Sequence, residues 1–108
     1  MTPSILPLNL LAGAVRLDDS LPGWTLLARS DQPESARSFS TRIAFERGFS
    51  GRPVVHLGII GFDMDNGDNA RLEVNVTSVD SDGFNVELRT WWNSRLWSVN
   101  LSWLAIGN

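Results

Sequence analysis

The chain has 108 residues, a formal net charge of −3 at pH 7 and no cysteine. Its length suits one domain with a single core, and the lack of cysteine excludes disulfides and thiolate metal sites. The acidic balance argues against a nucleic-acid partner, and no apolar run approaches the roughly 18 residues of a membrane span. We therefore expect no nucleic acid and no membrane insertion. We also expect no cofactor.

The first 22 residues differ from the rest of the chain. Four leucines between positions 6 and 11 precede the polar segment RLDDS, and Pro22-Gly23 follows. This composition predicts an arm or a short helix over residues 1–22, joined to a domain over residues 23–108. The apolar stretch has no basic residue before it and two prolines within it, unlike a secretion signal. We therefore expect no signal peptide, synthesis in the cytoplasm, and a site of action outside the cell or on a particle surface.

Alternating apolar and polar residues predict β-strands from Ala36 onward. The segment from Phe39 to Phe45 alternates and predicts a half-buried strand. The segment from Val54 to Phe62 is almost continuously apolar, which predicts a strand covered on both faces, the second by another subunit. Residues 70–79, 84–88 and 97–105 alternate again. With a short strand near Trp24, these segments predict an all-β sandwich of about six strands.

Three turn signals separate these strands. Asn66-Gly67, inside DMDNGDN, is a strong hairpin signal, DSDG at 80–83 predicts a second hairpin, and Asn93-Ser94 turns the chain once more. DMDNGDN is also similar to the start of a calcium-binding loop. However, Gly67 is fifth where such a loop needs glycine sixth, and Val74 stands at position twelve in place of a bidentate glutamate. We therefore expect a hairpin here and no metal site.

Catalytic groups are scarce. The single histidine, His56, lies inside the apolar segment VVHLGII, which favours a hydrogen-bonded histidine in a core or a subunit interface over a catalytic one. Five aspartates fall in turns, where aspartate serves turn chemistry: Asp63, Asp65, Asp68, Asp80 and Asp82. The sequence predicts neither an enzyme nor a catalytic residue.

Tryptophan is concentrated near the C-terminus, at positions 91, 92, 97 and 103. Trp97 and Trp103 are in phase with Val99 and Leu101, so we expect both indoles on the core face of that strand. Trp103 is predicted to be a core residue, and Trp97 to lie near the strand end.

Trp91 and Trp92 are adjacent, so they cannot both point inward from one strand. Trp91 is in phase with Asn85, Glu87 and Arg89, which places it on the outer face. An outward indole beside arginine and asparagine suits a sugar, whose apolar face stacks on the ring while its hydroxyls take hydrogen bonds. The alternative is that another subunit covers Trp91. For Trp92, at the end of the strand, a place at the rim of the site and burial both stay open.

Six short motifs follow one another in order: I-x-F at 43–45, RPVV at 52–55, N-x-R at 69–71, GF at 83–84, TW before Asn93-Ser94, and SWLAI at 102–106. By their order and spacing the chain resembles, from about Gly23 to its end, the H-type lectin family of the snail agglutinins and the C-terminal domain of discoidins. Residues 1–22 lie outside the resemblance.

The resemblance implies a six-stranded antiparallel β-sandwich that assembles as a homotrimer and binds galactose or N-acetylgalactosamine of glycans in clefts between protomers. Arg71 matches the family's sugar-binding arginine and Trp91 its site tryptophan, while Trp92 stands where the family often has histidine. The family's remaining contacts come from an acidic residue and a glycine of the adjacent subunit. The matching loop here, RSDQPES, offers Asp31 and Glu34 and no glycine.

Taken together, the residues and the resemblance predict a trimeric carbohydrate-binding module without catalytic activity. An alternative is a structural or adhesive head module of a phage-like or gene-transfer particle. In that case the fold serves mainly trimerisation and attachment, and residues 1–22 anchor the trimer to a larger particle or fibre. Both roles combine in a spike tip that binds cell-surface polysaccharide.

Overall fold

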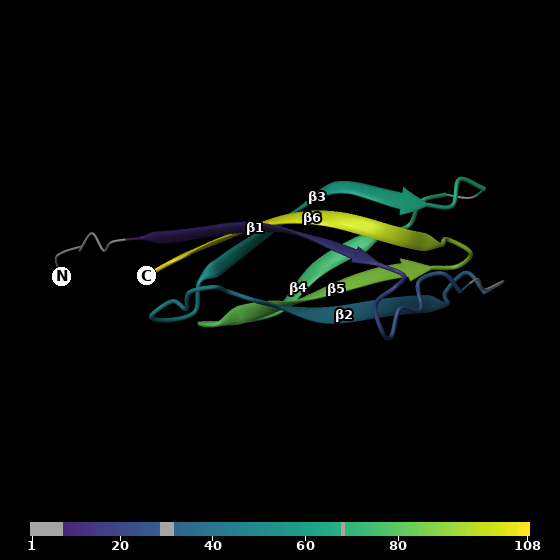
Figure 1. The fold of residues 1–108 in the computed structure, drawn as a ribbon. Helices are drawn as coiled ribbons and strands as arrows, with labels where there is room; N and C mark the ends of the chain where they lie inside the picture. The colour runs from purple at the N-terminus through teal and green to yellow at the C-terminus, as the bar shows by residue number, and fades with distance from the viewer. Residues whose placement is uncertain (1–7, 29–31, 68) are drawn as a thin grey trace.

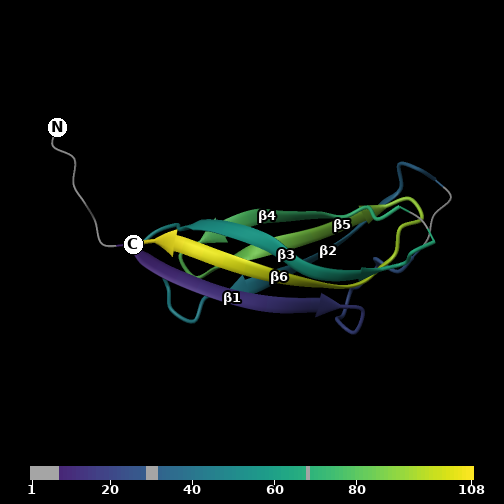
Figure 2. The same ribbon diagram turned by 90° about the horizontal axis from the view of Figure 1, so that it is seen from above.

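The computed structural model describes residues 8–28, 32–67 and 69–108. The strands are β1 (Asn9–Asp18), β2 (Ala36–Ala44), β3 (Val54–Met64), β4 (Glu73–Asp80), β5 (Gly83–Trp91) and β6 (Leu96–Gly107). They form two antiparallel three-stranded sheets, sheet A in the order β1-β6-β3 and sheet B in the order β2-β5-β4 (Figures 1 and 2). The predicted all-β sandwich with six antiparallel strands is confirmed.

The two central strands supply most of the core. On β5 the inward side chains of Phe84, Val86 and Leu88 are fully buried, as the period of two in the sequence predicts. Val99 and Leu101 of β6 are fully buried in the same cluster, from the facing sheet. Because both strands lie in the middle of their sheets, their outward side chains are held in place by neighbours on either side.

An aromatic cluster closes the core between the sheets. The ring of Trp103 lies 5.6 Å, centroid to centroid, from the rings of both Phe45 and Phe84. Trp103 therefore faces the core, as predicted. Gly13 of β1 lies directly against this indole, because a Cβ built on Gly13 would be only 2.6 Å from Trp103 Cε2.

The N-terminal segment differs from the prediction. Residues 9–18, expected in an arm outside the domain, form β1 and pair with β6 along its length, from Asn9 opposite Gly107 to Asp18 opposite Ser98. The reason is an alternation in which Leu11, Val15 and Leu17 face the core while the residues between them, two of them alanines, point outward or leave room for Trp103. Residues 1–7 of the expected arm lie outside the described residues.

The strand expected near Trp24 is absent from the described residues, so that prediction was wrong. Gly23 adopts a left-handed φ of 86°, which breaks an extended run at this point. Trp24 instead packs its ring 5.0 Å from the ring of Phe39, and its Nε1–H donates to the carbonyl of Leu96 at 3.0 Å.

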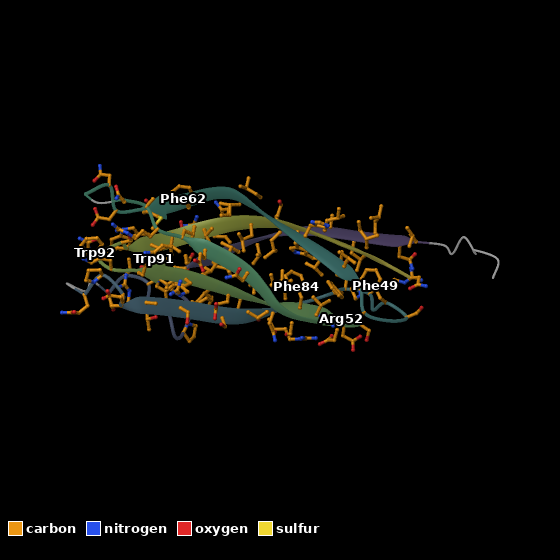
Figure 3. All side chains as sticks on the ribbon, turned by 180° about the vertical axis from the view of Figure 1, so that it is seen from behind. Phe49, Arg52, Phe62, Phe84, Trp91 and Trp92 are labelled. Carbon is orange, nitrogen blue, oxygen red and sulfur yellow. The ribbon has the colours of Figure 1, made fainter. Side chains whose placement is uncertain are left out.

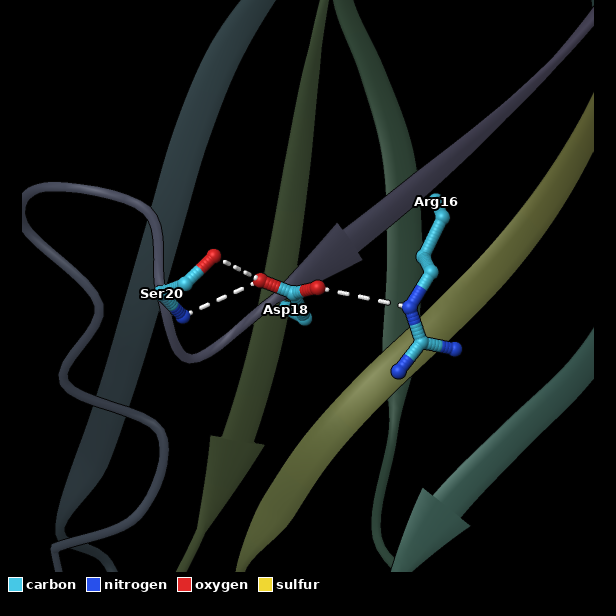
Figure 4. Close-up of polar contacts among 3 residues, drawn as sticks. All are labelled: Arg16, Asp18 and Ser20. Atoms are coloured by element: carbon cyan, nitrogen blue, oxygen red, sulfur yellow. Dashed lines mark hydrogen bonds and ion pairs between the residues drawn. The ribbon is translucent and has the colours of Figure 1, made fainter.

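A polar turn ends β1 (Figure 4). The carboxylate of Asp18 accepts from the hydroxyl and the backbone N–H of Ser20, at 2.5 and 3.0 Å, and from Nε of Arg16 at 3.3 Å. The hydrogen bonds from Ser20, followed by the guanidinium of Arg16, hold the pKa of Asp18 below its ordinary value. These bonds turn the chain away from sheet A toward sheet B.

The connections also correct one turn prediction. Asn66-Gly67 does form a turn, with the Gly67 N–H donating to the Asp65 carboxylate at 3.0 Å, but β3 belongs to sheet A and β4 to sheet B. The predicted hairpin is therefore wrong. The dipeptide fixes the local backbone geometry of the turn, but it does not determine with which strands β3 and β4 pair. The second predicted hairpin is confirmed, since β4 and β5 pair up to Asp80 opposite Gly83.

Sheet A leaves apolar side chains exposed. Strand β3, predicted to be covered on both faces, is an edge strand whose Val54, Ile59, Ile60 and Phe62 are 48–62% exposed within this single chain. His56, expected in a core or a subunit interface, is likewise exposed, opposite Leu104.

Trp97, expected on the core face of β6, is also exposed. The β3–β6 register skips it between the Asp63–Ser98 and Met64–Leu96 pairs, so the alternation on which the prediction depended breaks there. Within the described ranges, no helix is long and apolar enough to cross a membrane.

Candidate functional site

Three connections meet at the end of the sandwich where β5 finishes. The backbone N–H of Trp92, just after β5, donates to the carbonyl of Ser35, just before β2, at 2.8 Å. The N–H of Asp65, just after β3, donates to the carbonyl of Arg95 at 3.0 Å. Figure 3 shows Trp91 and Trp92 together at this end of the molecule. The chain order therefore brings the loops before β2, before β4 and before β6 to one place.

Trp91 lies on the outer face of sheet B. It is the last residue of β5, opposite Ala36 in the register, and it is partly exposed while its inward neighbour Thr90 is fully buried. The prediction that this indole leaves the core is confirmed. The guanidinium of Arg89, two residues earlier on the same face, lies over the indole with Cζ 5.4 Å from its ring centroid. A small residue opposite Trp91 leaves the ring uncovered by β2.

Arg71 reaches the same end from the segment before β4. Its Nη1 donates to the hydroxyl of Ser94 at 2.9 Å, to Oδ1 of Asn93 at 3.2 Å and to the carbonyl of Asn69 at 3.4 Å. Its Cζ lies 4.8 Å from the ring centroid of Trp92, in a cation–π contact. The structure thus brings Arg71, Trp91 and Trp92, which sequence analysis selected from two distant segments, to one end of the fold.

Further hydrogen bonds fix Arg71 through its backbone. The buried hydroxyl of Thr90 donates to the Arg71 carbonyl at 2.6 Å, and the hydroxyl of Ser94 donates to the carbonyl of Asn69 at 2.7 Å. Ser94 is 2% exposed, so its hydroxyl is held between Arg71 and Asn69 away from water. The guanidinium is therefore presented from a rigid support rather than from a free loop.

Trp92 adopts a left-handed backbone conformation, with φ of 57°, which is rare for a residue with a bulky side chain. Arg37 of β2 stabilises it: Nη1 donates to the carbonyl of Trp92 at 2.6 Å and Nη2 to the carbonyl of Ser94 at 2.5 Å. Burial lowers the pKa of Arg37, and its buried Nε has no hydrogen-bond partner among the residues that the structure describes. Trp92 was expected either at the rim of the site or buried. Its ring is partly exposed and lies beneath the Arg71 guanidinium, so it fits neither alternative fully.

Arg37 was missed in the sequence. A signal was present, because Arg37 is in phase with Phe39 and so stands at a core-facing position of β2, where an arginine needs a specific set of acceptors. The pattern identifies the unusual position, but only the fold shows that the acceptors belong to the turn after Trp91.

Of the two acidic candidates, the structure describes only Glu34. Asp31 lies outside the described residues. Glu34 is exposed and directly precedes Ser35, whose carbonyl accepts from the Trp92 N–H, so it lies near Trp92 in space. No hydrogen bond or ion pair joins it to another described residue. In one protomer the structure does not bring Glu34 into contact with Arg71. Among the described residues no cluster of three metal-ligating side chains occurs.

A separate cleft of about 360 Å³ lies between the edges of the two sheets. It is lined by residues 11–15 of β1, by Ile43, Ala44 and Glu46, and by Trp103. It contains none of the candidate sugar-binding residues, and only one of its side chains, Glu46, is ionisable. We therefore place the candidate site at the end of the sandwich and not in this cleft.

Comparison with known proteins identifies relatives. Residues 40–106 match the family model described as the H-type lectin domain. Two solved structures of discoidin II from Dictyostelium discoideum superpose with TM-scores of 0.74 and 0.76 at 23% and 21% identity. They cover 100% and 99% of this chain, so the shared fold includes β1, which the sequence resemblance left out.

A curated protein of Fuscovulum blasticum, described as "ATP synthase subunits region ORF 7", is 31% identical over 72 residues. That alignment covers 67% of this chain and 63% of the relative, and this chain spans 41% and 39% of the two discoidin chains. The matched region thus covers less than two thirds of the length of each of these relatives.

Proposed function

The chain belongs to the H-type lectin family of carbohydrate-binding modules, and from this premise we propose that it binds galactose- or N-acetylgalactosamine-like residues of cell-surface glycans without catalysing a reaction. The observation that supports a site at the end of β5 is the convergence there of an outward indole, Trp91, and an arginine held on a rigid support, Arg71. An apolar ring face beside directional donors is what a sugar requires.

We assign the stacking platform to Trp91. One face of Trp92 already lies under the Arg71 guanidinium at 4.8 Å, so Trp92 serves better as a support for the arginine than as a platform for the sugar. Trp92 keeps its Nε1–H as a donor at the rim, in place of the histidine that is usual in the family. Arg89 lies over Trp91 at a greater distance, 5.4 Å, and its side chain is 39% exposed, so a sugar can displace it.

The assembly we propose is a homotrimer in which the loop carrying Asp31 and Glu34 of one protomer completes the site of the next. The exposed apolar side chains of sheet A support association, since soluble monomers rarely leave such a surface in water. Light scattering at micromolar concentration should give three times the chain mass, about 36 kDa from the 12.0 kDa chain. A monomer under those conditions excludes a site shared between protomers.

The proposed function is tested first on a glycan array with purified protein, and then by titration of the best glycan. Trp91→Ala and Arg71→Ala should each weaken binding by about 1–3 kcal/mol, the scale of a lost aromatic contact or a charged hydrogen bond. The matched control is Trp103→Ala, which should lower the free energy of unfolding by about 3–5 kcal/mol and leave binding by the folded fraction intact. If Trp91→Ala unfolds early and still binds normally, the site assignment is wrong.

A second candidate function is attachment within a phage-like or gene-transfer particle. The apolar outer surface of sheet A favours it, because the same surface serves trimerisation whether or not a glycan binds. Residues 9–18 are part of the sheet, so an anchor within residues 1–22 would have to use the flanking positions. A folded trimer that binds no glycan on the array would favour this function over the first.

A further inference from the structure

The arginines at the site end of the molecule differ in their partners. Arg89 pairs with Glu73 at 3.4 Å, and Arg95 pairs with Asp65 at 3.8 Å. Arg71, in contrast, is contacted only by neutral oxygens, those of Asn69, Asn93 and Ser94. Among the described residues no carboxylate neutralises its charge.

The geometry of Arg71 leaves one edge of the guanidinium open. All three hydrogen bonds use Nη1, while Nη2 and Nε have no partner among the described residues. Its Cζ lies over the Trp92 ring at 4.8 Å from the centroid, so a rotation of the group would cost these contacts. The N–H groups of Nη2 and Nε point the same way, and their spacing matches that of the two oxygens of a carboxylate. A carboxylate can therefore accept one hydrogen bond from each.

We propose that this site selects acidic saccharides, and that the carboxylate of a uronic acid binds the Nη2–Nε edge of Arg71 while the sugar ring lies against Trp91. This inference rests on the proposed carbohydrate-binding function and names the ligand class within it. A neutral sugar also hydrogen-bonds to this edge, but only a carboxylate compensates the charge that the three neutral oxygens leave on Arg71. The chain's net charge of −3 opposes acidic ligands in general, so the preference must come from this local contact.

The test compares ligands that differ by one group: methyl galactoside with methyl galacturonoside, and methyl glucoside with methyl glucuronoside, titrated by calorimetry at pH 7. In at least one pair the acid should bind about tenfold more tightly than the neutral sugar, and the advantage should shrink in 0.5 M NaCl. Arg71→Gln should reduce the advantage to about twofold or less, and Arg71→Lys, which keeps the charge without the fork, should retain part of it.

Arg42→Gln is the matched control, because Arg42 lies on the same sheet at the opposite end and is paired with Asp80 at 2.9 Å. It removes the same charge and should leave the acid preference unchanged. Equal binding of acid and neutral sugar, or an equal loss in both glutamine variants, overturns the acid preference while carbohydrate binding stands. Failure of the wild-type protein to bind any of the four sugars, or any glycan on the array, would instead overturn the proposed function.

Discussion

A single methyl group added at Gly13 tests whether β1 packs on the core as described. A Cβ at this position would lie 2.6 Å from both Cε2 and Cζ2 of Trp103 and 2.7 Å from its Nε1. The rings of Phe45 and Phe84, whose centroids lie 5.6 Å from that of the indole, hinder its movement toward the core. Gly13→Ala therefore forces the indole or β1 to move.

The expected magnitude follows from two opposing terms. Overpacking of a core by one carbon costs about 1–3 kcal/mol. Replacing a strand glycine by alanine recovers about 0.5–1 kcal/mol, because the unfolded chain loses conformational freedom. The free energy of unfolding should therefore fall by about 1–2 kcal/mol, which lowers the melting temperature by roughly 4–10 °C in a domain of this size.

Thermal and urea unfolding followed by tryptophan fluorescence measure the change. The control is Gly51→Ala, because a Cβ at Gly51 has nothing within 4 Å and the residue is exposed. If Gly13→Ala melts together with Gly51→Ala at or above the wild-type temperature, β1 does not pack on Trp103 as described.

Three further outcomes are expected. Arg37→Met should lower the free energy of unfolding by about 1–3 kcal/mol in urea melts and weaken glycan binding by the folded fraction, because the carbonyls of Trp92 and Ser94 lose their donors. Hydrogen bonds from Ser20 lower the pKa of Asp18, so its contribution to stability is present above the ordinary value of 3.8 and is lost as pH falls through the lowered pKa. Asp18→Asn should accordingly lose less stability than wild type between about pH 5 and pH 2 in urea melts, and an equal slope would contradict this. Deleting residues 1–18 should abolish the cooperative thermal transition seen by circular dichroism, because β6 loses its partner strand and Leu17 leaves the core; an unchanged melt would restore the interpretation of an independent arm.

Most strands from Ala36 onward could be predicted because one face of each is buried, and burial imposes a period of two on the sequence. The segment from Val54 to Phe62 was predicted from its continuous apolar run instead. β1 was missed since three of its outer positions hold Leu10, Ala12 and Ala14 in place of polar residues, so that Leu11 and Val15 do not stand out from an apolar background. The hairpin at Asn66-Gly67 was wrong for a different reason. Turn residues report φ and ψ over a few positions, whereas the choice of sheet depends on residues far away in the chain.

The candidate site was partly accessible from the sequence. Alternation placed Trp91 outside the core, and the family resemblance selected Arg71. Neither could show that Arg71 stacks on Trp92, since that contact joins the segment before β4 to the turn after β5. The hydrogen bonds from Arg37 to that turn were equally hidden, because side-chain direction at a strand end depends on a backbone conformation, φ of 57° at Trp92, that tryptophan rarely adopts.

The pairing of Asn9 with Gly107 has a consequence for orientation. It places the start of β1 and the end of β6 side by side at the end of the sandwich farthest from Trp91, because β6 runs from the turn after Trp92 to that end (Figure 1). A segment that continues from the end of β6 therefore leaves the sandwich at the end opposite Trp91. A protein immobilised through its C-terminus should therefore hold the end that carries Trp91 and Arg71 outward, toward the medium.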